Sequence, residues 1–283
     1  MNAPDPRPVC ALTIAGSDSG GGAGIQADLK TFAAHGVHGL SALAALTAQH
    51  TRGVAAVHVP PLDFLRAQID ACFADFRVHV VKLGMLASAE VIHAVADALE
   101  HHRPAALVLD PVMVATSGAR LLEENALQAL RTRLIPLASV TTPNIPEAEQ
   151  LLGHPIPDGE SAESAVGELL SLGARAVLLK GGHLPGTDEV VDRLCLGDRN
   201  HVSRFVHPRL DVNGHGTGCT LASAIAAQLC LGRPLPDACA EASDYVHGAL
   251  VHAYRPGSSN VSVLEHFWRH KASAARDPER QAS

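Results

Sequence analysis

Short apolar segments alternate with longer segments of helical periodicity along most of this 283-residue chain. The apolar segments have the length and composition of buried strands, and they are Val9–Ala15, His79–Leu83, Ala105–Asp110, Val140–Thr142 and Ala176–Lys180. The predicted helices are Gly24–Ala34, Leu62–Phe76, Ala87–His101, Glu123–Leu134 and Ala162–Leu172. Strand and helix in repeated succession require crossover connections. We therefore expect an α/β fold with a mostly parallel central sheet covered by helices on both faces.

A hairpin and two C-terminal helices complete the predicted elements. Their ranges are Val190–Leu196 with His201–Val206 for the hairpin, and Thr217–Leu231 and Asp237–Tyr254 for the helices. Leu40–Gln49 is apolar, and its periodicity does not decide between strand and helix. The sequence has no internal repeat and no linker, so we expect a single domain over 1–283 with flexible ends at 1–8 and 271–283.

The composition argues against several classes of partner. The net charge is -7 and the basic residues are dispersed, which does not suggest a nucleic-acid or membrane surface. The apolar run from Val9 to Gly16 is too short to span a bilayer and is not followed by a signal cleavage site. The six cysteines lack Cys-x-x-Cys or metal-ligand spacing, so they are typical of the reduced thiols of a cytoplasmic protein.

A glycine-rich segment before the first C-terminal helix is the strongest functional signal. Gly214, Gly216 and Gly218 alternate with His215 and Thr217 and lead directly into an alanine-rich helix. Glycines allow close approach of a ligand, and the free amides and dipole of a helix start attract an anion, so a phosphate is the predicted occupant. A tight strand-to-helix turn without a ligand is the alternative.

Charged residues at the ends of predicted strands are the next candidates, because ligands of parallel sheets gather at the carboxyl ends. Asp110 ends one strand and suits a magnesium ion whose other ligands are phosphates, although it could instead cap the next element. Asn144 is typical of an N-cap and Glu147 of a first helical turn, which already explains both in structural terms. Lys180 ends a core strand before two glycines, where phosphate is a good partner. Lys82 is predicted to pair with a carboxylate.

The loop from Gly16 to Gly24 follows the first strand and contains a run of glycines. It lacks the spacing of the dinucleotide fingerprint, and the sequence contains no Walker loop. Such a loop still indicates close approach by a substrate or by another loop, with a flexible turn as the alternative.

Taken together, these motifs resemble the ribokinase superfamily and, more narrowly, its hydroxymethylpyrimidine kinase/phosphomethylpyrimidine kinase family. The narrower match spans roughly residues 9 to 255 and is carried by the segments 15–32, Thr47–Gln49, Lys82–Leu86, Asp110–Met113, Thr142–Ala148, Lys180–His183 and His215–Thr220.

The resemblance implies a ribokinase-like αβα sandwich, a homodimer, and magnesium-dependent transfer of phosphate from ATP. The acceptors would be 4-amino-5-hydroxymethyl-2-methylpyrimidine and then its monophosphate, in thiamine biosynthesis. The implied substrate-binding positions are Gly16, Asp28, Gln49, Met85 and Val112. The implied catalytic and nucleotide-binding positions are Asn144, Lys180, Gly216, Thr217, Gly218 and Cys219, with Asp110 and Glu147 at the metal.

Three residues make this resemblance more specific. Cys219 and Gln49 agree with the narrower family, and Gly20 departs from its pattern. The wider superfamily usually has aspartate as general base where this chain has Cys219, and a thiol pKa lowered at a helix start would make a thiolate base feasible. Gly20 stands where the family commonly has serine, which loses a hydroxyl near the substrate. The nearest alternative is a pyridoxal kinase, and Gln49 discriminates between the two. A primary amide pairs with the ring nitrogen and the amino group of an aminopyrimidine, whereas pyridoxal offers a phenolic oxygen and an aldehyde. A non-catalytic pyrimidine-binding regulator would not need the anion loop and charged residues together.

Overall fold

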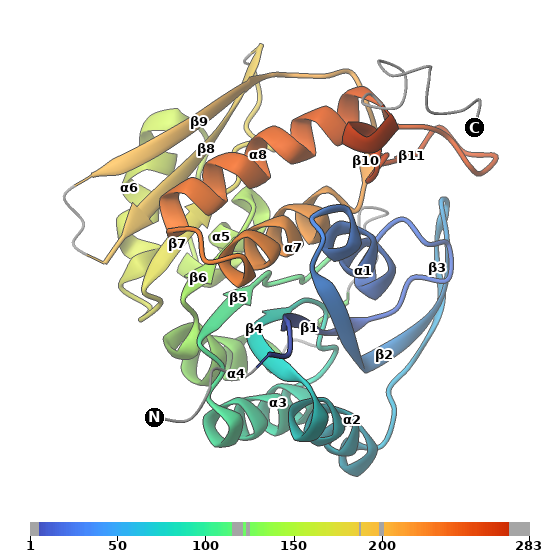
Figure 1. The fold of residues 1–283 in the computed structure, drawn as a ribbon. Helices are drawn as coiled ribbons and strands as arrows, with labels where there is room; N and C mark the ends of the chain where they lie inside the picture. Colours follow the sequence, from blue (N-terminus) through green and yellow to red (C-terminus); the bar gives the residue numbers. More distant parts are fainter. Residues whose placement is uncertain (1–5, 115–120, 123–124, 187, 198–200, 272–283) are drawn as a thin grey trace, which may run out of the picture.

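A nine-stranded sheet in the order β3-β2-β1-β4-β5-β6-β7-β8-β9 forms the centre of the computed structural model (Figure 1). The structure describes residues 6–114, 121–122, 125–186, 188–197 and 201–271. The flexible ends predicted at 1–8 and 271–283 therefore fall mainly outside the described residues.

The six strands β2, β1, β4, β5, β6 and β7, in their order across the sheet, are parallel to one another. Antiparallel pairs form both edges, with β3 beside β2 at one edge and with β8 and β9 beside β7 at the other. Their bounds are β1 Val9–Gly16, β2 His38–His50, β3 Gly53–His58, β4 Arg77–Leu83, β5 Ala106–Leu109, β6 Val140–Thr141, β7 Ala176–Leu179, β8 Glu189–Leu196 and β9 Val202–Pro208. A separate parallel pair joins β10 (Gly214–His215) to β11 (Ser262–Val263).

Helices cover both faces of the sheet, as the sequence predicts. They are α1 Gly24–Ala34, α2 Leu62–Asp75, α3 Ala89–His102, α4 Ala126–Ala129, α5 Ile145–Leu152, α6 Gly159–Leu170, α7 Thr217–Cys230 and α8 Leu235–Val251. None of the helices in the described part of the chain is long and apolar enough to cross a membrane.

Most predicted elements are confirmed within one to four residues, and the exceptions have physical causes. Leu40–Gln49, left undecided, belongs to strand β2. The sequence analysis did not predict the exposed edge strand β3, because its side chains contribute little to the core and give no apolar pattern. Of the predicted helix Glu123–Leu134, residues 123–124 lie outside the described part of the chain. Its described part begins with α4 and continues as a π-helical turn at Leu130–Leu134, and a 3-10 turn at Ile135–Leu137 follows. Pro136 lies in the 3-10 turn and lacks the amide that an α-helix would need there.

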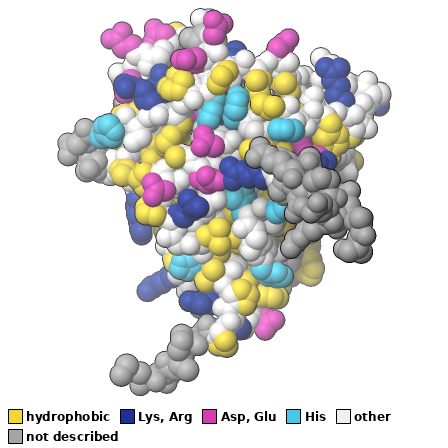
Figure 2. Space-filling model, turned by 45° about the horizontal axis from the view of Figure 1, so that its top comes forward, with side chains coloured by type: hydrophobic (Ala, Val, Ile, Leu, Met, Phe, Trp, Pro, Cys, Tyr) yellow, Lys and Arg dark blue, Asp and Glu magenta, His cyan; other side chains and the backbone are white. Residues whose placement is uncertain are grey.

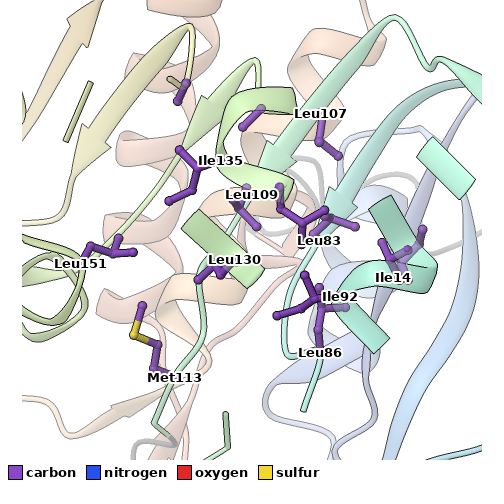
Figure 3. Close-up of a cluster of buried hydrophobic side chains, with 14 of the residues drawn as sticks. Ile14, Leu83, Leu86, Ile92, Leu107, Leu109, Met113, Leu130, Ile135 and Leu151 are labelled. Carbon is purple, nitrogen blue, oxygen red and sulfur yellow. The ribbon is translucent and has the colours of Figure 1, made fainter. Parts of the chain in front are cut away.

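Two apolar cores lie on opposite faces of the sheet, because side chains alternate along each strand. Leu12, Leu83 and Leu109 face helices α2 to α6, and this cluster is drawn in part in Figure 3. Ala11 and Val108 face the other way, toward α1, α7 and α8. The two cores fix the helices on both faces, so the observed architecture is the expected αβα sandwich.

A buried ion pair ties the second of these layers to the sheet. Lys82 on β4 donates to both carboxylate oxygens of Asp28 on α1 at 2.9 Å, and both side chains are fully buried. Asp28 also accepts hydrogen bonds from Thr13 on β1 at 2.6 Å and from Ser223 on α7 at 2.7 Å. The prediction that Lys82 pairs with a carboxylate is confirmed. Four elements therefore meet at Asp28.

Replacing Asp28 should destabilise the fold strongly. Asp28→Ala leaves the Lys82 ammonium buried without a partner, and breaking a buried pair in this way costs about 3–5 kcal/mol. The free energy of unfolding, measured by urea denaturation, should fall by this amount. The matched control is Asp97→Ala, which breaks the exposed pair with Arg133 and should cost less than about 1 kcal/mol. Equal losses in the two variants would contradict this account.

Candidate active site

A cavity of about 730 Å³ opens at the carboxyl ends of the parallel strands. It is lined by all but one of the residues that the sequence singles out: Gly16, Gln49, Met85, Asp110, Val112, Asn144, Glu147, Lys180, Gly216, Thr217, Gly218 and Cys219. The exception is Asp28, which lies behind the cavity in its pair with Lys82. Topology brings these residues together, because parallel strands end at one edge of the sheet, where Met85 follows β4, Asp110 follows β5 and Lys180 follows β7. The start of α7 reaches the same edge from β10 and lies beside Lys180.

The glycine segment forms the tight entry to α7. Gly216 is the N-cap with a φ of 83°, and a Cβ atom there would lie 2.0 Å from the carbonyl oxygen of Gly22. The Thr220 amide is bonded to the Gly216 carbonyl at 2.9 Å, so the amides of Thr217 to Cys219 precede the first helical hydrogen bond. These amides and the helix dipole lie at the cavity wall, and together they are suited to bind an anion.

Two carboxylates and one ammonium lie beside that anion site. Lys180 Nζ is 2.9 Å from Asp110 Oδ1 and 3.7 Å from Glu147 Oε2. A Cβ atom at Gly218 would lie 3.0 Å from the Lys180 nitrogen, so the glycine lets the helix start approach this cluster. Burial opposes the charge on Lys180, but Asp110 and Glu147 outweigh it and raise the pKa of the ammonium.

Glu147 has both the structural role predicted for it and an unusual electrostatic environment. Asn144 is the N-cap of α5, and the two residues exchange hydrogen bonds in a capping box, at 2.9 Å and 2.7 Å. Burial raises the pKa of Glu147 to about 7, with Lys180 opposing and Asp110 adding to the effect. Burial is thus the main reason that Glu147 holds its proton more tightly than an exposed glutamate does.

The described residues contain no group of three or more His, Cys, Asp and Glu side chains that could hold a metal. The donor set that remains beside the anion loop is the pair Asp110 and Glu147, both with hard oxygen atoms. Such a pair suits a cation whose remaining ligands are phosphate oxygens and water.

Cys219 differs from the expectation drawn from its sequence position. Its thiol is half-buried at the start of α7. Burial raises the pKa of Cys219 to about 11, and Asp110 and Asp28 act in the same direction. The opposing effects of Lys82 and of a hydrogen bond from the Gly24 amide are smaller. The prediction of a lowered pKa is therefore wrong for the protein without a ligand, because a helix start cannot offset desolvation beside two carboxylates.

The other end of the cavity has an apolar wall. Met85 lies between β4 and α3, packs with Ala45 and Ala87, and is contacted by the partly buried Val112. A Cβ atom at Gly16 would lie 2.9 Å from the Met85 sulfur, so only glycine leaves the thioether in place. A flat ring would find apolar contact with this wall.

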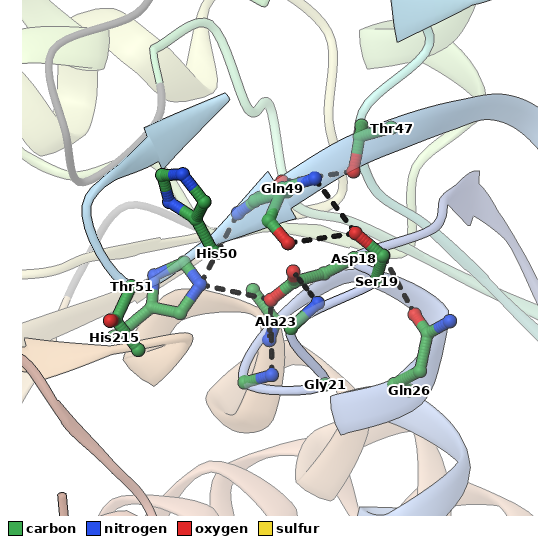
Figure 4. A network of polar contacts seen from close by, with 12 residues as sticks. Asp18, Ser19, Gly21, Ala23, Gln26, Thr47, Gln49, His50, Thr51 and His215 are labelled. Atoms are coloured by element: carbon green, nitrogen blue, oxygen red, sulfur yellow. Dashed lines mark hydrogen bonds and ion pairs between the residues drawn. The ribbon is translucent and has the colours of Figure 1, made fainter. Parts of the chain in front are cut away.

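Gln49 supplies the polar group at this end, within a hydrogen-bond network shown in Figure 4. The register of β2 shifts at Ala48 and Gln49, a bulge that directs the amide. Thr47 Oγ1 donates to Gln49 Oε1 at 3.2 Å, and Gln49 Nε2 lies 3.3 Å from His215 Nε2. His215 Nε2 is also 3.0 Å from Asp18 Oδ2. The amide is thus linked to both glycine loops.

Asp18 is the important residue that sequence reasoning did not single out. Its carboxylate accepts hydrogen bonds from the amides of Gly20, Gly22 and Ala23 at 2.8, 3.0 and 2.9 Å. Burial raises the pKa of Asp18, but the hydrogen bonds from His215 and the loop amides outweigh it and lower the pKa. An aspartate two to five residues before a run of glycines was the available signal. Gly20 contributes its amide to this carboxylate even without the usual serine hydroxyl.

Comparisons with known proteins agree with this geometry. The family model described as phosphomethylpyrimidine kinase matches residues 18–264. The chain belongs to the phosphomethylpyrimidine kinase family. A hydroxymethylpyrimidine/phosphomethylpyrimidine kinase of Streptomyces coelicolor is 46% identical over 95% of this chain and 98% of its own length. The thiamine biosynthesis bifunctional protein ThiED of Geobacter sulfurreducens is 55% identical over 88% of this chain, which spans 50% of that protein.

Solved structures give the same assignment of family and fold. Phosphomethylpyrimidine kinase of Clostridium difficile superposes with a TM-score of 0.75 at 43% identity, covering 84% of this chain and 98% of that one. Pyridoxal kinase of Staphylococcus aureus in complex with AMP-PCP and pyridoxal superposes with a TM-score of 0.84 at 29% identity, covering 94% and 96%. The sequence-based prediction of a kinase of this family is confirmed, and the pyridoxal kinase has the same fold.

The Cys219 thiol should react slowly with iodoacetamide at neutral pH. Because its pKa is raised to about 11, the thiolate fraction is small, and the alkylation rate should rise roughly tenfold per pH unit from neutral to alkaline pH. Peptide mass spectrometry of the ligand-free protein measures this rate, with Cys219→Ser marking the peptide. A rate that is already maximal at neutral pH would mean that Cys219 is a thiolate in the resting protein.

Proposed function

We propose that this protein phosphorylates 4-amino-5-hydroxymethyl-2-methylpyrimidine with ATP, and then phosphorylates the monophosphate with a second ATP, for thiamine biosynthesis. The observation that carries the proposal is that one cavity joins Gln49, Met85 and Val112 at one end to Lys180 and the α7 start at the other. We assign the first end to the ring of the acceptor and the second to phosphate. The names of the Streptomyces and Geobacter relatives, a hydroxymethylpyrimidine/phosphomethylpyrimidine kinase and a thiamine biosynthesis protein, support the same substrates and pathway.

At the ring-binding end, Gln49 would recognise the aminopyrimidine. Its amide offers a donor to a ring nitrogen and an acceptor to the amino group, the same pairing that amides make with adenine. Met85 and Val112 would contact the two faces of the ring, with Gly16 leaving room for the thioether. Asp28 would act through Lys82 and the strand ends, as a positioning residue behind the ring pocket.

At the anion-binding end, the residues would stabilise the charge of the transferred phosphoryl group. Lys180 would neutralise the phosphates, and the amides of Gly216, Thr217 and Gly218 would hold the oxygen atoms at the helix start. Asn144 fixes the start of α5 and would line the nucleotide's phosphate path. Asp110 would hold Mg²⁺ with Glu147 nearby, and the bound ion would neutralise phosphate charge.

In the first step the acceptor is an alcohol, which must lose a proton when its oxygen bonds to the γ-phosphorus and ADP leaves. Cys219 lies at the anion loop and is the candidate for that proton. In the second step the acceptor oxygen belongs to a phosphate that is already ionised. Cys219 would therefore matter mainly for the first step. Because its raised pKa keeps the thiol protonated, Cys219 could accept the proton of the alcohol only after positive charge bound nearby had lowered its pKa and its own proton had passed to solvent.

The test is turnover of four acceptors with ATP and Mg²⁺: hydroxymethylpyrimidine, its monophosphate, pyridoxal, and none. We expect product mass to show phosphorylation of both pyrimidines, and chelation of Mg²⁺ by EDTA to abolish it. Gln49→Ala should lower kcat/KM for hydroxymethylpyrimidine by about 100-fold, because two hydrogen bonds to the ring are lost. Turnover of pyridoxal alone would instead favour the pyridoxal kinase alternative.

The same assay separates the two steps in Cys219→Ala. This variant should lose the first phosphorylation by at least about 100-fold, the usual contribution of an acid–base group, while retaining most of the second. Cys219→Ser is the matched control for side-chain volume. Equal loss of both steps would contradict a role in proton transfer and indicate a role in shaping the anion loop.

We further propose a cytoplasmic homodimer, assembled through the β3 edge of the sheet. Leu46, Val57 and Phe64 on β2, β3 and α2 are 41%, 45% and 60% exposed, and β3 leaves an unpaired strand edge beside them. On the face of the molecule that Figure 2 shows, side chains of all four coloured types are mixed, and neither positive nor negative side chains form one extended patch. Sedimentation velocity should give a dimer for the protein and a monomer for Phe64→Asp. A wild-type monomer at micromolar concentration would contradict the proposal.

A further inference from the structure

The cavity extends past Lys180 toward the other edge of the sheet, beyond the residues that the proposed transfer uses. This extension is lined by residues of β8, β9 and α8 and of the segment before β10: Val190, His207, Val212, Val246, His247 and Leu250. Four of these six are apolar, and Asp192, Arg209 and Ser243 add polar atoms to the same wall. The extension therefore offers a flat group apolar contact beside a few polar partners.

The order of the strands shows what must lie there if the proposed function holds. Lys180 follows β7, and β8 and β9 are the next two strands. Adjacent strands are about 4.8 Å apart, so β9 lies roughly 10 Å from the phosphate end of the site. A nucleoside triphosphate held by its outer phosphates at Lys180 would therefore extend its base into this part of the cavity.

Two stacked histidines stand out in this extension. The rings of His207 on β9 and His247 on α8 have centroids 4.7 Å apart and planes inclined by 13°. His207 is fixed from its far side, because its Nε2 lies 3.1 Å from Ser243 Oγ and 3.4 Å from Asp244 Oδ1. In the described part of the chain, neither ring nitrogen of His247 has a hydrogen-bond partner. The pair thus offers a preorganised aromatic face with free polar atoms.

We propose that His247, supported by His207, binds the base of the nucleotide and makes the enzyme prefer purine over pyrimidine triphosphates. This inference rests on the proposed function and deepens it. A stacked ring gains contact area in proportion to the size of the base, so a purine gains more than a pyrimidine. The free ring nitrogens of His247 can donate or accept a hydrogen bond, depending on the tautomer, and so can serve either purine.

The proposal is tested by calorimetric binding of the non-hydrolysable analogue AMP-PCP and of inorganic triphosphate, both with Mg²⁺. Loss of one base stack is worth about 1.4 kcal/mol, so His247→Ala should weaken AMP-PCP binding roughly tenfold and leave inorganic triphosphate unchanged. His247→Phe, which keeps a flat ring, should restore most of the affinity.

The matched control is His252→Ala at the end of the same helix. His252 also stacks on an aromatic ring, with centroids 5.6 Å from Trp268, but it does not line the cavity. This variant should bind AMP-PCP as the wild type does. In turnover, His247→Ala should raise KM for ATP more than KM for CTP. It should leave KM for the acceptor, hydroxymethylpyrimidine, unchanged.

The outcomes separate the inference from the function on which it rests. If the wild type binds AMP-PCP and His247→Ala binds it equally well, or if His247→Phe does not restore binding, the base is not held by this stack. A parallel loss of inorganic triphosphate binding would also overturn the inference, because the variant would then have damaged the phosphate end. A wild type that binds no AMP-PCP at all would overturn the proposed kinase function instead.

Discussion

The rest of this structure depends on one constraint, the parallel alignment of the strands β2, β1, β4, β5, β6 and β7. Because all of these strands end at one edge of the sheet, residues far apart in the sequence meet in one cavity. Gln49 leaves β2, Asp110 follows β5 and Lys180 follows β7. The order of the strands in the sheet then sets the order of these residues along the cavity, from Gln49 at β2 to the histidine pair at β9.

Buried charge is balanced in two neighbouring clusters behind and beside the α7 start. Lys82 and Asp28 form a closed pair, in which Thr13 and Ser223 satisfy the remaining carboxylate positions. The cluster of Lys180 with two carboxylates lines the cavity, and burial there raises the pKa of Glu147. The closed pair serves the fold, whereas the open cluster can accept a cation or redistribute its contacts when phosphates bind.

Several site residues could be predicted because their chemistry is local. Asn144 and Glu147 form the capping box that their spacing indicates, and the glycines before α7 take the tight entry expected of them. Asp28 and Cys219 were harder because their properties depend on distant neighbours. The partner of Asp28 is 54 residues away at Lys82, and the pKa of Cys219 is set by desolvation and by two carboxylates from other elements.

The sequence by itself determined the α/β class, the family, most element boundaries and the types of residue at the strand ends, because periodicity and motifs are encoded over short distances. The tertiary structure alone decided which of these residues face the cavity and which are closed off in the core. It also decided how burial changes their proton affinity, and that His207 and His247 stack. These properties depend on desolvation and on contacts between distant segments, which no local pattern specifies.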